Sequence, residues 1–398
     1  MMGKPKIRFK GYNEDWEQRK FSELVMIERG GSPRPIDKYI TKAENGLNWV
    51  KIGDAPEQSN YITKTSEKII PEGLSKTREV HPGDLILSNS MSFGRPYIMA
   101  IDGCIHDGWL AIRDTEKRFD LKFLCTLLGT DSMLNQYKAM AAGSTVNNLN
   151  KELVGSTIVS FPKMDEQTKI GEYFTNLDHL ITLHQHKCDE MKKLKKYMLQ
   201  KMFPKNGKKV PEIRFDGFTN DWEQRKFIDI ATRGSSVCTS ASDIPSVEYE
   251  DVVAEEGRLN KDIRSKEAVK SGITFDGSQV LYGKLRPYLH NWLNPDFKGV
   301  AVGDWWVLKP INVDKNFLYR LIQTQQFDNI ANQSSGSKMP RADWNLISNS
   351  EFMVPLSKKE QSKIGRYFDN LDHLITLHQH KCDELQNFKK YMLQNMFV

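Results

Sequence analysis

Histidine and cysteine stand close together in a segment that occurs twice, at a spacing that could bind a metal ion. The pattern His-x-His-x-Cys occupies residues 184–188 and again residues 378–382. Imidazole nitrogen and thiolate sulfur are common ligands of zinc and copper. In a helix, however, residues 184 and 188 share a face while residue 186 points away, so only two of the three side chains could reach one ion. We therefore predict no metal site and interpret His184 and His378 as polar residues that fix the register of a helix pair.

Motifs of catalysis are missing from the sequence. It has no G-x-x-x-x-G-K-[ST] loop, no glycine-rich nucleotide fingerprint after a strand, and no Asn/Asp-Pro-Pro-aromatic tetrapeptide of the kind found in amino-methyltransferases. Residues 190–192 (Glu-Met-Lys) imitate part of a nuclease motif, but the second copy reads Glu-Leu-Gln at 384–386. We expect no catalytic residue and no cofactor in this chain.

A long helix must position the histidine and cysteine pattern. Residues 166–203 and 360–397 are two copies of a 38-residue segment that differ at 8 positions. Apolar residues step by three, four or seven, and no Gly or Pro stands between Gly171 and Pro204, which predicts an amphipathic helix. Residues 166–201 would span about 54 Å at ~1.5 Å per residue. So long an apolar stripe needs a partner, and we expect the two copies to pair as an antiparallel coiled coil. The predicted seam consists of Ile170, Phe174, Leu177, Ile181, Cys188, Met191 and Met198 with Ile364, Phe368, Leu371, Ile375, Cys382, Leu385 and Met392.

A second repeated block stands before each variable region. PKIRFKGYNEDWEQRKF at 5–21 and PEIRFDGFTNDWEQRKF at 211–227 are identical at 12 of 17 positions. The chain thus runs front block, variable region, helical block, and then repeats this order. Random sequence divergence after a gene duplication would be a simpler explanation of the difference between the two variable regions. Divergence alone, however, should also have changed the flanking blocks. We interpret the variable regions as one fold that carries two different surfaces.

The variable regions have the pattern of mixed α/β domains. Residues 82–97 (PGDLILSNSMSFGRPY) resemble 276–288 (DGSQVLYGKLRPY), and 143–162 match 336–355 in length. Branched and aromatic residues predict short strands at 85–88, 97–101, 109–112, 157–162, 279–282, 305–308 and 351–355. Residues 123–137 and 317–331 have apolar residues at helical spacing.

The predicted fold class is α+β, with two similar mixed α/β globular domains separated by two long helices and related by a pseudo-two-fold. We predict a front block at 1–21, a first domain at 22–162 and a central helix at 163–204. A linker and second front block at 205–227, a second domain at 228–356 and a C-terminal helix at 357–398 follow.

Composition limits the class of protein. Hydrophobic residues make up 39% of the 398 residues and charged residues 27%, which suits a folded and soluble chain. The net charge of +6 and pI of about 8.8 permit DNA binding without requiring it. Five cysteines without a C-x-x-C pair argue against a disulfide framework or a zinc ribbon. No apolar run approaches the ~20 residues of a membrane span, and we expect a cytoplasmic protein without a signal segment or membrane partner.

Taken together, these features resemble the specificity subunit of type I restriction-modification systems over essentially the whole chain. The likeness rests on Trp-Glu at 16–17 and 222–223, Pro-Gly-Asp at 82–84, Gly-Ser at 143–144 and 336–337, and Glu-Gln followed by Ile-Gly at 166–171 and 360–365. The resemblance implies two target recognition domains that bind double-stranded DNA, and no active site in this chain. It also implies two modification subunits, which bind S-adenosylmethionine and methylate adenine, and two restriction subunits, which use ATP and Mg²⁺ to translocate and cut DNA.

The resemblance also directs attention to polar loops. Each domain would read one half of a bipartite, asymmetric site in the major groove, with the helices setting the spacer. The candidate contact residues are Ser88, Asn89, Ser90, Ser92, Arg95, Ser144, Thr145, Asn147 and Asn148, opposite Lys284, Arg286, Tyr288, Ser337, Lys338 and Arg341. An ordinary solvated loop position or a local turn bond is the other interpretation of each residue. Arg95 and Arg286 stand at matching positions of the two domains, each before Pro-Tyr, which suits phosphate positioning or structure better than discrimination between half-sites.

Two other classes of protein compete with this interpretation. A scaffold built from a tandem repeat would bind proteins through its helices and never touch DNA. A self-sufficient methyltransferase would need a cofactor motif that the sequence lacks.

Overall fold

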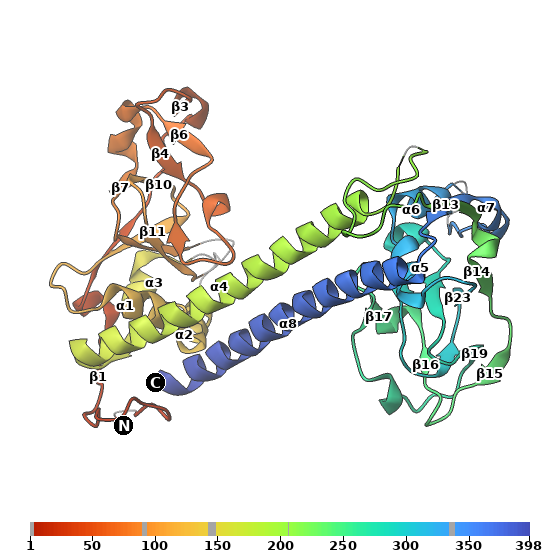
Figure 1. Cartoon of the computed structure of the whole chain (residues 1–398). Coiled ribbons are helices and arrows are strands. Elements are labelled where there is room, and N and C mark those ends of the chain that lie inside the picture. Colours follow the sequence, from red (N-terminus) through yellow and green to blue (C-terminus); the bar gives the residue numbers. More distant parts are fainter. Residues whose placement is uncertain (1–3, 90–93, 142–148, 206, 334–338) are drawn as a thin grey trace. The chain divides into compact units, whose positions relative to one another are not determined.

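The computed structural model describes residues 4–89, 94–141, 149–205, 207–333 and 339–398 (Figure 1). The chain divides into two compact units. Unit 1 comprises Met1–Gln185 with His380–Val398, and unit 2 comprises His186–Gln379. The long helices α4 (Met164–Lys201) and α8 (Lys358–Met396) each contribute one part to each unit.

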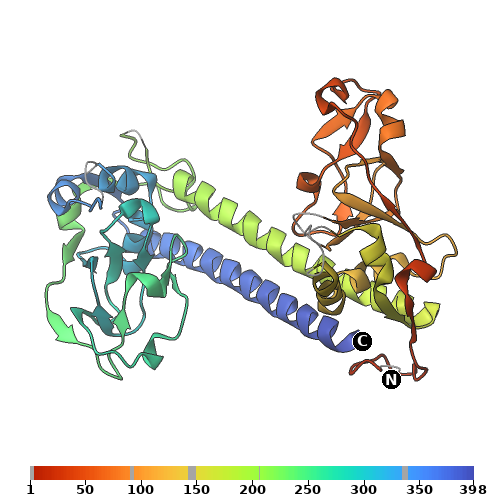
Figure 2. The ribbon, with the colours of Figure 1, turned by 180° about the vertical axis from the view of Figure 1, so that it is seen from behind.

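The described residues of unit 1 form sheets flanked by short helices. One sheet has the order β2-β11-β8-β9-β5, with strands Met26–Arg29, Trp109–Arg113, Leu85–Ser88, Pro96–Met99 and Tyr61–Ile62. A second has the order β3-β6-β4-β10-β7, with strands Ile40–Thr41, Glu67–Ile69, Leu47–Val50, Gly103–Ile105 and Arg78–Val80. Strand β1 (Glu17–Lys20) pairs antiparallel with β12 (Ile158–Phe161). The helices are α1 (Leu121–Leu128), α2 (Asp131–Ala141) and α3 (Lys151–Ser156), with 3-10 turns at Phe21–Glu23, Ile36–Lys38, Ile52–Asp54 and Pro71–Lys76. Figures 1 and 2 show α1 and α2 beside the first part of α4, with the second sheet at the far end of the unit.

Unit 2 repeats this architecture in its described residues, with four strands in each of its two larger sheets in place of five. One sheet has the order β14-β23-β20-β21, with strands Ala231–Arg233, Trp305–Pro310, Val280–Gly283 and Trp292–Leu293. A second has the order β15-β19-β22-β16, with strands Val237–Thr239, Ser271–Phe275, Gly299–Ala301 and Ser246–Val247. Antiparallel pairs join β13 (Glu223–Lys226) to β24 (Glu351–Val354) and β17 (Val252–Val253) to β18 (Arg258–Leu259). The helices are α5 (Lys315–Leu321), α6 (Gln325–Ala331) and α7 (Trp344–Asn349), with 3-10 turns at Phe227–Asp229, Tyr249–Asp251, Ile263–Ser265 and Pro287–Leu289.

The two units share one topology. Strands β2-β11-β8-β9 of unit 1 correspond in order to β14-β23-β20-β21 of unit 2. Each unit also has one parallel pair in its second sheet, β4 with β10 and β16 with β22. The predicted class of two similar mixed α/β domains with long helices is therefore confirmed.

The predicted helical segments at 123–137 and 317–331 are each two helices. A threonine begins the second helix of each pair: Thr130 Oγ1 accepts from the amide of Met133, and Thr324 Oγ1 accepts from the amide of Phe327, both at 3.4 Å. A threonine hydroxyl that accepts from a backbone amide three residues on is an N-cap, and it starts a new helix in a new direction. Apolar spacing alone does not reveal such a break.

The long helices pair antiparallel inside each unit. In unit 1, Lys389 of α8 binds Asp178 of α4 at 2.5 Å, and Cys382 of α8 lies 3.6 Å from the side-chain oxygen of Gln185. In unit 2 the roles are exchanged between the helices. Lys195 of α4 binds Asp372 of α8 at 2.7 Å, and Cys188 of α4 lies 3.7 Å from the side-chain oxygen of Gln379. The expected antiparallel pairing is thus present, with equivalent contacts in both units.

The predicted seam has two parts. Cys188 and Cys382 are buried between the helices, as expected. Ile170, Phe174 and Leu177 instead join the core of unit 1. Their counterparts Ile364, Phe368 and Leu371 join the core of unit 2. The apolar stripe of each long helix therefore packs into the core of a domain along its first part and against the other helix farther on.

The front blocks complete the cores. Trp16 packs edge-on against Phe123 of α1 and Phe397 at the end of the chain. In unit 2, Trp222 packs in the same way against Phe317 of α5 and Phe203 after α4. The end of one repeated helix therefore closes the core that the other repeated helix begins.

The residues that the structure describes contain no helix long and apolar enough to cross a membrane.

Candidate nucleic-acid interface

The start of one candidate segment of unit 1 and the end of the other meet at one point of its first sheet. The first loop follows β8, and its residue Asn89 donates its backbone amide to Gly108 O, just before β11, at 2.9 Å. The second loop ends at Leu149, whose amide donates to Asn89 O at 3.1 Å. Asn89 is thus the point at which both candidate loops meet the sheet.

Unit 2 joins its two candidate loops in the same way. Lys284, directly after β20, donates its amide to Asp304 O at 2.9 Å, and Ala342 donates its amide to Lys284 O at 2.8 Å. Arg286 N also donates to Pro340 O at 2.7 Å, and Leu285 forms an isolated bridge with Arg341. The candidate segments of the two units therefore join the first sheet of each unit at equivalent points.

Ser88 and Asn89 serve that frame in unit 1. Both side chains are buried, at 0% and 3% exposure. The Ser88 hydroxyl accepts from the Arg95 amide at 2.9 Å, and the Asn89 side-chain amide donates to Asp107 O at 3.0 Å. These contacts match the local-bond interpretation that the sequence offered beside DNA contact.

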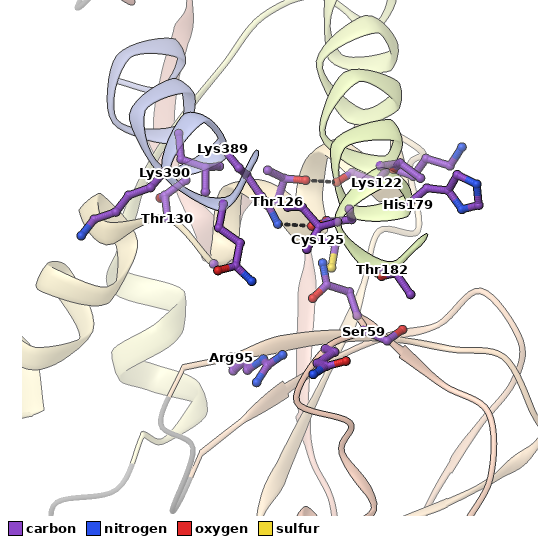
Figure 3. A pocket seen from close by; sticks show the side chains of 18 of the residues that line it. Ser59, Arg95, Lys122, Cys125, Thr126, Thr130, His179, Thr182, Lys389 and Lys390 are labelled. Carbon is purple, nitrogen blue, oxygen red and sulfur yellow. Dashed lines mark hydrogen bonds and ion pairs between the residues drawn. The ribbon is translucent and has the colours of Figure 1, made fainter. Parts of the chain in front are cut away.

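Arg95 lines a cleft of about 790 Å³ in unit 1 (Figure 3). Its guanidinium donates to Glu57 O at 2.5 Å and lies 5.1 Å from the centre of the Tyr97 ring. Figure 3 shows Lys389 and Lys390 of α8 and Lys122 of α1 around the same cleft. The carboxylates of Glu57, Asp131 and Asp178 also line it, so its wall is mixed in charge rather than strongly basic.

Lys284 and Arg341 converge on one carboxylate in unit 2. Arg341 donates from Nε and Nη2 to the two oxygens of Asp304, at 3.2 and 3.0 Å. Lys284 Nζ lies 3.4 Å from Asp304 Oδ1. The Arg341 hydrogen bonds, together with the Lys284 charge, hold the pKa of Asp304 below its ordinary value. The carboxylate is therefore ionised near neutral pH, and Arg341 still exposes 53% of its side chain.

Arg286 and Tyr288 shape the turn that follows Lys284. Arg286 has a left-handed backbone, with φ 49° and ψ 64°, directly before a proline. Its Nε is buried and has no hydrogen-bond partner within the described ranges. Left-handed non-glycine residues are costly and gather at functional sites. Tyr288, two residues on, is 53% exposed.

The remaining predicted contact residues lie outside the described residues. They are Ser90, Ser92, Ser144, Thr145, Asn147, Asn148, Ser337 and Lys338. DNA contact by these residues stays a prediction, as it does for Arg95, Lys284, Arg286, Tyr288 and Arg341.

Sequence reasoning missed the two aspartates that organise these loops. Asp304 holds Lys284 and Arg341, and Asp107 accepts from Asn89 and from the Ser32 hydroxyl. Each stands one or two residues before a tryptophan that begins a central strand, Trp109 or Trp305. The two aspartates are therefore not at equivalent positions, because Asp107 stands two residues before Trp109 and Asp304 one residue before Trp305.

The His-x-His-x-Cys pattern has the arrangement that helix geometry predicts. The His186 side chain is 70% exposed and its Nδ1 lies 3.5 Å from Glu190 Oε1, whereas Cys188 is buried. Over the described ranges, no group of three or more His, Cys, Asp or Glu residues could hold a metal ion.

Solved structures contain the same architecture. A crystal structure of the S subunit of a type I restriction-modification system from M. genitalium has a TM-score of 0.67 to this chain, at 14% identity, and covers 100% of this chain and 99% of that one. A second chain, from a study of complex assembly and conformational transition of the type I R-M system, has a TM-score of 0.54 at 15% identity and covers 96% and 97%. The chain thus has the fold of these two solved structures, with two similar domains and two long helices.

Sequence comparison identifies the family. The family model of the type I restriction modification DNA specificity domain matches the chain twice, at residues 13–193 and 219–387. The type I restriction enzyme MjaVIII specificity subunit of Methanocaldococcus jannaschii is 21% identical over 96% of this chain and 91% of its own length. The chain belongs to the family of type I restriction-modification DNA specificity proteins.

Proposed function

We propose that this chain recognises a two-part DNA site, with one half read by each unit. The observation that carries the proposal is the common frame of the loops: Asn89 in unit 1 and Lys284 in unit 2 join both variable loops by equivalent backbone hydrogen bonds. One frame with two sets of side chains suits a site with unequal halves. The major groove suits the reading because all four base pairs differ there. The proposed recognition domains comprise residues 22–162 and 228–356.

The long helices are the proposed ruler between the half-sites. Helices α4 and α8 are each continuous and belong in part to both units. Four residues added to each helix near the unit boundary would lengthen it by ~6 Å, or nearly two base pairs at ~3.4 Å. Seven added residues would also keep the heptad phase of the helix pair. Both variants should methylate sites with a longer gap.

The chain would act in the cytoplasm as the non-catalytic part of a larger enzyme. We propose two modification subunits, which bind S-adenosylmethionine and methylate adenine, and two restriction subunits, which use ATP and Mg²⁺. The family match supports this assignment of roles, and the chain itself would contribute only recognition.

Mapping methylated adenines in cells that express the chain with its partners tests the proposal. A two-part target with a fixed gap is expected, and the helix-lengthened variants should widen that gap. If the gap stays the same in both variants, the helices do not set the distance between the half-sites. Loss of methylation without any sequence preference in DNA binding would favour the protein-binding scaffold instead.

A further inference from the structure

Asp304 lies at the point where the two variable loops of unit 2 meet. Its backbone oxygen accepts from the Lys284 amide at 2.9 Å and from the Tyr249 hydroxyl at 2.7 Å. The same hydroxyl accepts from the Leu285 amide at 2.9 Å. Tyr249 thus fixes the main chain at Asp304 and Leu285 together, so the Asp304 carboxylate has little freedom to move.

The carboxylate in turn fixes the plane of Arg341. Two hydrogen bonds, from Nε and Nη2, hold a guanidinium to a carboxylate in one plane. The edge that faces Asp304 is the Nε–Nη2 edge, and therefore the Nη1–Nη2 edge faces away from it. That edge carries two parallel N–H groups, the arrangement that matches the N7 and O6 acceptors of guanine.

The local charge also favours reading a base over holding a phosphate. Asp304 offsets one of the two positive charges of Lys284 and Arg341, so the cluster attracts the DNA backbone less strongly than two unpaired cations would. An uncompensated positive charge strengthens a phosphate contact, whereas a fixed side-chain orientation makes recognition of a base edge more specific.

We infer that Asp304 is a positioning residue that holds Arg341 for a guanine in the half-site read by unit 2. This assignment rests on the proposed DNA recognition. It adds that guanine is the base read at this point and that Asp304 orients the arginine. Among the described residues of unit 1, Asn89 stands where unit 2 has Lys284, and its side chain donates to Asp107 O at 3.0 Å. The two units would therefore differ in the base that they require at this point.

The test uses the full chain assembled with its modification subunits. Duplexes that carry every single-base change in each half-site are compared for binding by the wild type, Arg341→Ala, Arg341→Lys and Asp304→Asn. Asp243→Asn is the matched control, since Asp243 pairs with Lys298 at 2.6 Å elsewhere in unit 2. Thermal unfolding of each variant establishes that its fold is intact.

The wild type should prefer guanine at one position of one half-site by about tenfold or more. Arg341→Ala, Arg341→Lys and Asp304→Asn should each lose that preference while the other half-site and the control stay unchanged. Asp304→Asn should bind DNA without the site as tightly as the wild type or more tightly, because it gains net positive charge. Retained guanine preference in Asp304→Asn, or a lost preference for another base, overturns the inference. A wild type without any sequence preference overturns the proposed function itself.

Discussion

Arg8 and Glu166 form a two-pronged ion pair in unit 1, with Nε and Nη2 of the arginine each 2.7 Å from one carboxylate oxygen. The glutamate side chain is 2% exposed. Arg214 and Glu360 repeat the pair in unit 2, at 2.7 and 2.9 Å. Each arginine comes from a front block and each glutamate from the first turn of a long helix. The ion pair holds each front block to the start of a long helix. This gives a physical reason why both segments are repeated although the variable regions between them differ.

Replacing Arg8 with alanine should destabilise unit 1 strongly. The change leaves the Glu166 carboxylate buried without its cation, a loss that typically costs about 3–5 kcal/mol. Hydrogen exchange of the backbone amides of unit 1 would measure the free energy of its unfolding.

The control for this experiment is Lys4→Ala. Lys4 and Asp15 form an ion pair of 3.1 Å whose side chains are 63% and 46% exposed, and such pairs contribute only about 0.2–1 kcal/mol. An equal loss in both variants would contradict the role given to the buried pair.

Alanine at Gly171 should destabilise the chain, although alanine usually favours a helix. A Cβ atom there would lie 2.5 Å from Asp120 Oδ1 and 2.8 Å from the Phe123 amide, so helix α1 would have to move away from α4. Overpacking of this kind costs about 1–3 kcal/mol. Denaturant unfolding would measure the change, with Gly53→Ala as the control because nothing lies within 4 Å of a Cβ at that position. Stabilisation by Gly171→Ala would show that the close packing of the two helices has been misjudged.

Unit 2 should lose stability in acid through Asp251 and Glu248. Burial tends to raise the pKa of Asp251, but hydrogen bonds from Lys266 and the Glu248 amide outweigh it, and the pKa lies below its ordinary value of 3.8. Hydrogen bonds from Lys266 and Lys270 lower the pKa of Glu248 below 4.5. A carboxylate whose pKa is lower in the folded state stabilises the fold above its unfolded pKa, and this stabilisation disappears as the pH falls through the folded pKa.

Asp251→Asn tests this pH dependence. The variant should be less stable than the wild type at neutral pH by about 3 kcal/mol, since Lys266 and Lys261 lose a buried partner. Its stability should also fall less steeply below about pH 4.5, as measured by unfolding of unit 2 across that range. Glu267→Gln, at an exposed position, is the control and should follow the wild-type curve. A steeper fall in Asp251→Asn would contradict the sign of the effect.

Alanine at Lys284 and Lys338 should weaken DNA binding in a salt-dependent way. Each lost phosphate contact should reduce the slope of log affinity against log salt by about 1. Lys298→Ala serves as the control, because Lys298 is bound to Asp243 and belongs to neither candidate loop. Unchanged affinity and slope in the double variant would favour the scaffold interpretation over DNA recognition.

Much of the architecture could be predicted because the repeats carry their own pattern. Strand 85–88 was predicted at its observed bounds, and the long helices begin and end within a few residues of the predicted ones. The breaks at Thr130 and Thr324 were not predicted, because an N-cap is one hydroxyl in an otherwise apolar helical pattern.

The candidate interface was harder to predict than the fold. The sequence did not predict that the two candidate segments of each unit meet at one point of a sheet. Ser88 and Asn89 are buried, since polarity alone does not separate a residue that contacts a ligand from one that forms a local hydrogen bond. Asp304 was missed because its role depends on Lys284 and Arg341, which are distant in sequence and meet only in the folded chain.

Exchange of one proposed recognition domain tests whether each unit reads its own half of the DNA site. Residues 228–356 would be replaced by the corresponding segment of a relative with a known target, and the methylated adenines would be mapped in cells that contain the partner subunits. We expect a hybrid target in which one half-site is new while the other half-site and the gap are retained. A target in which both halves change, or neither does, would contradict it.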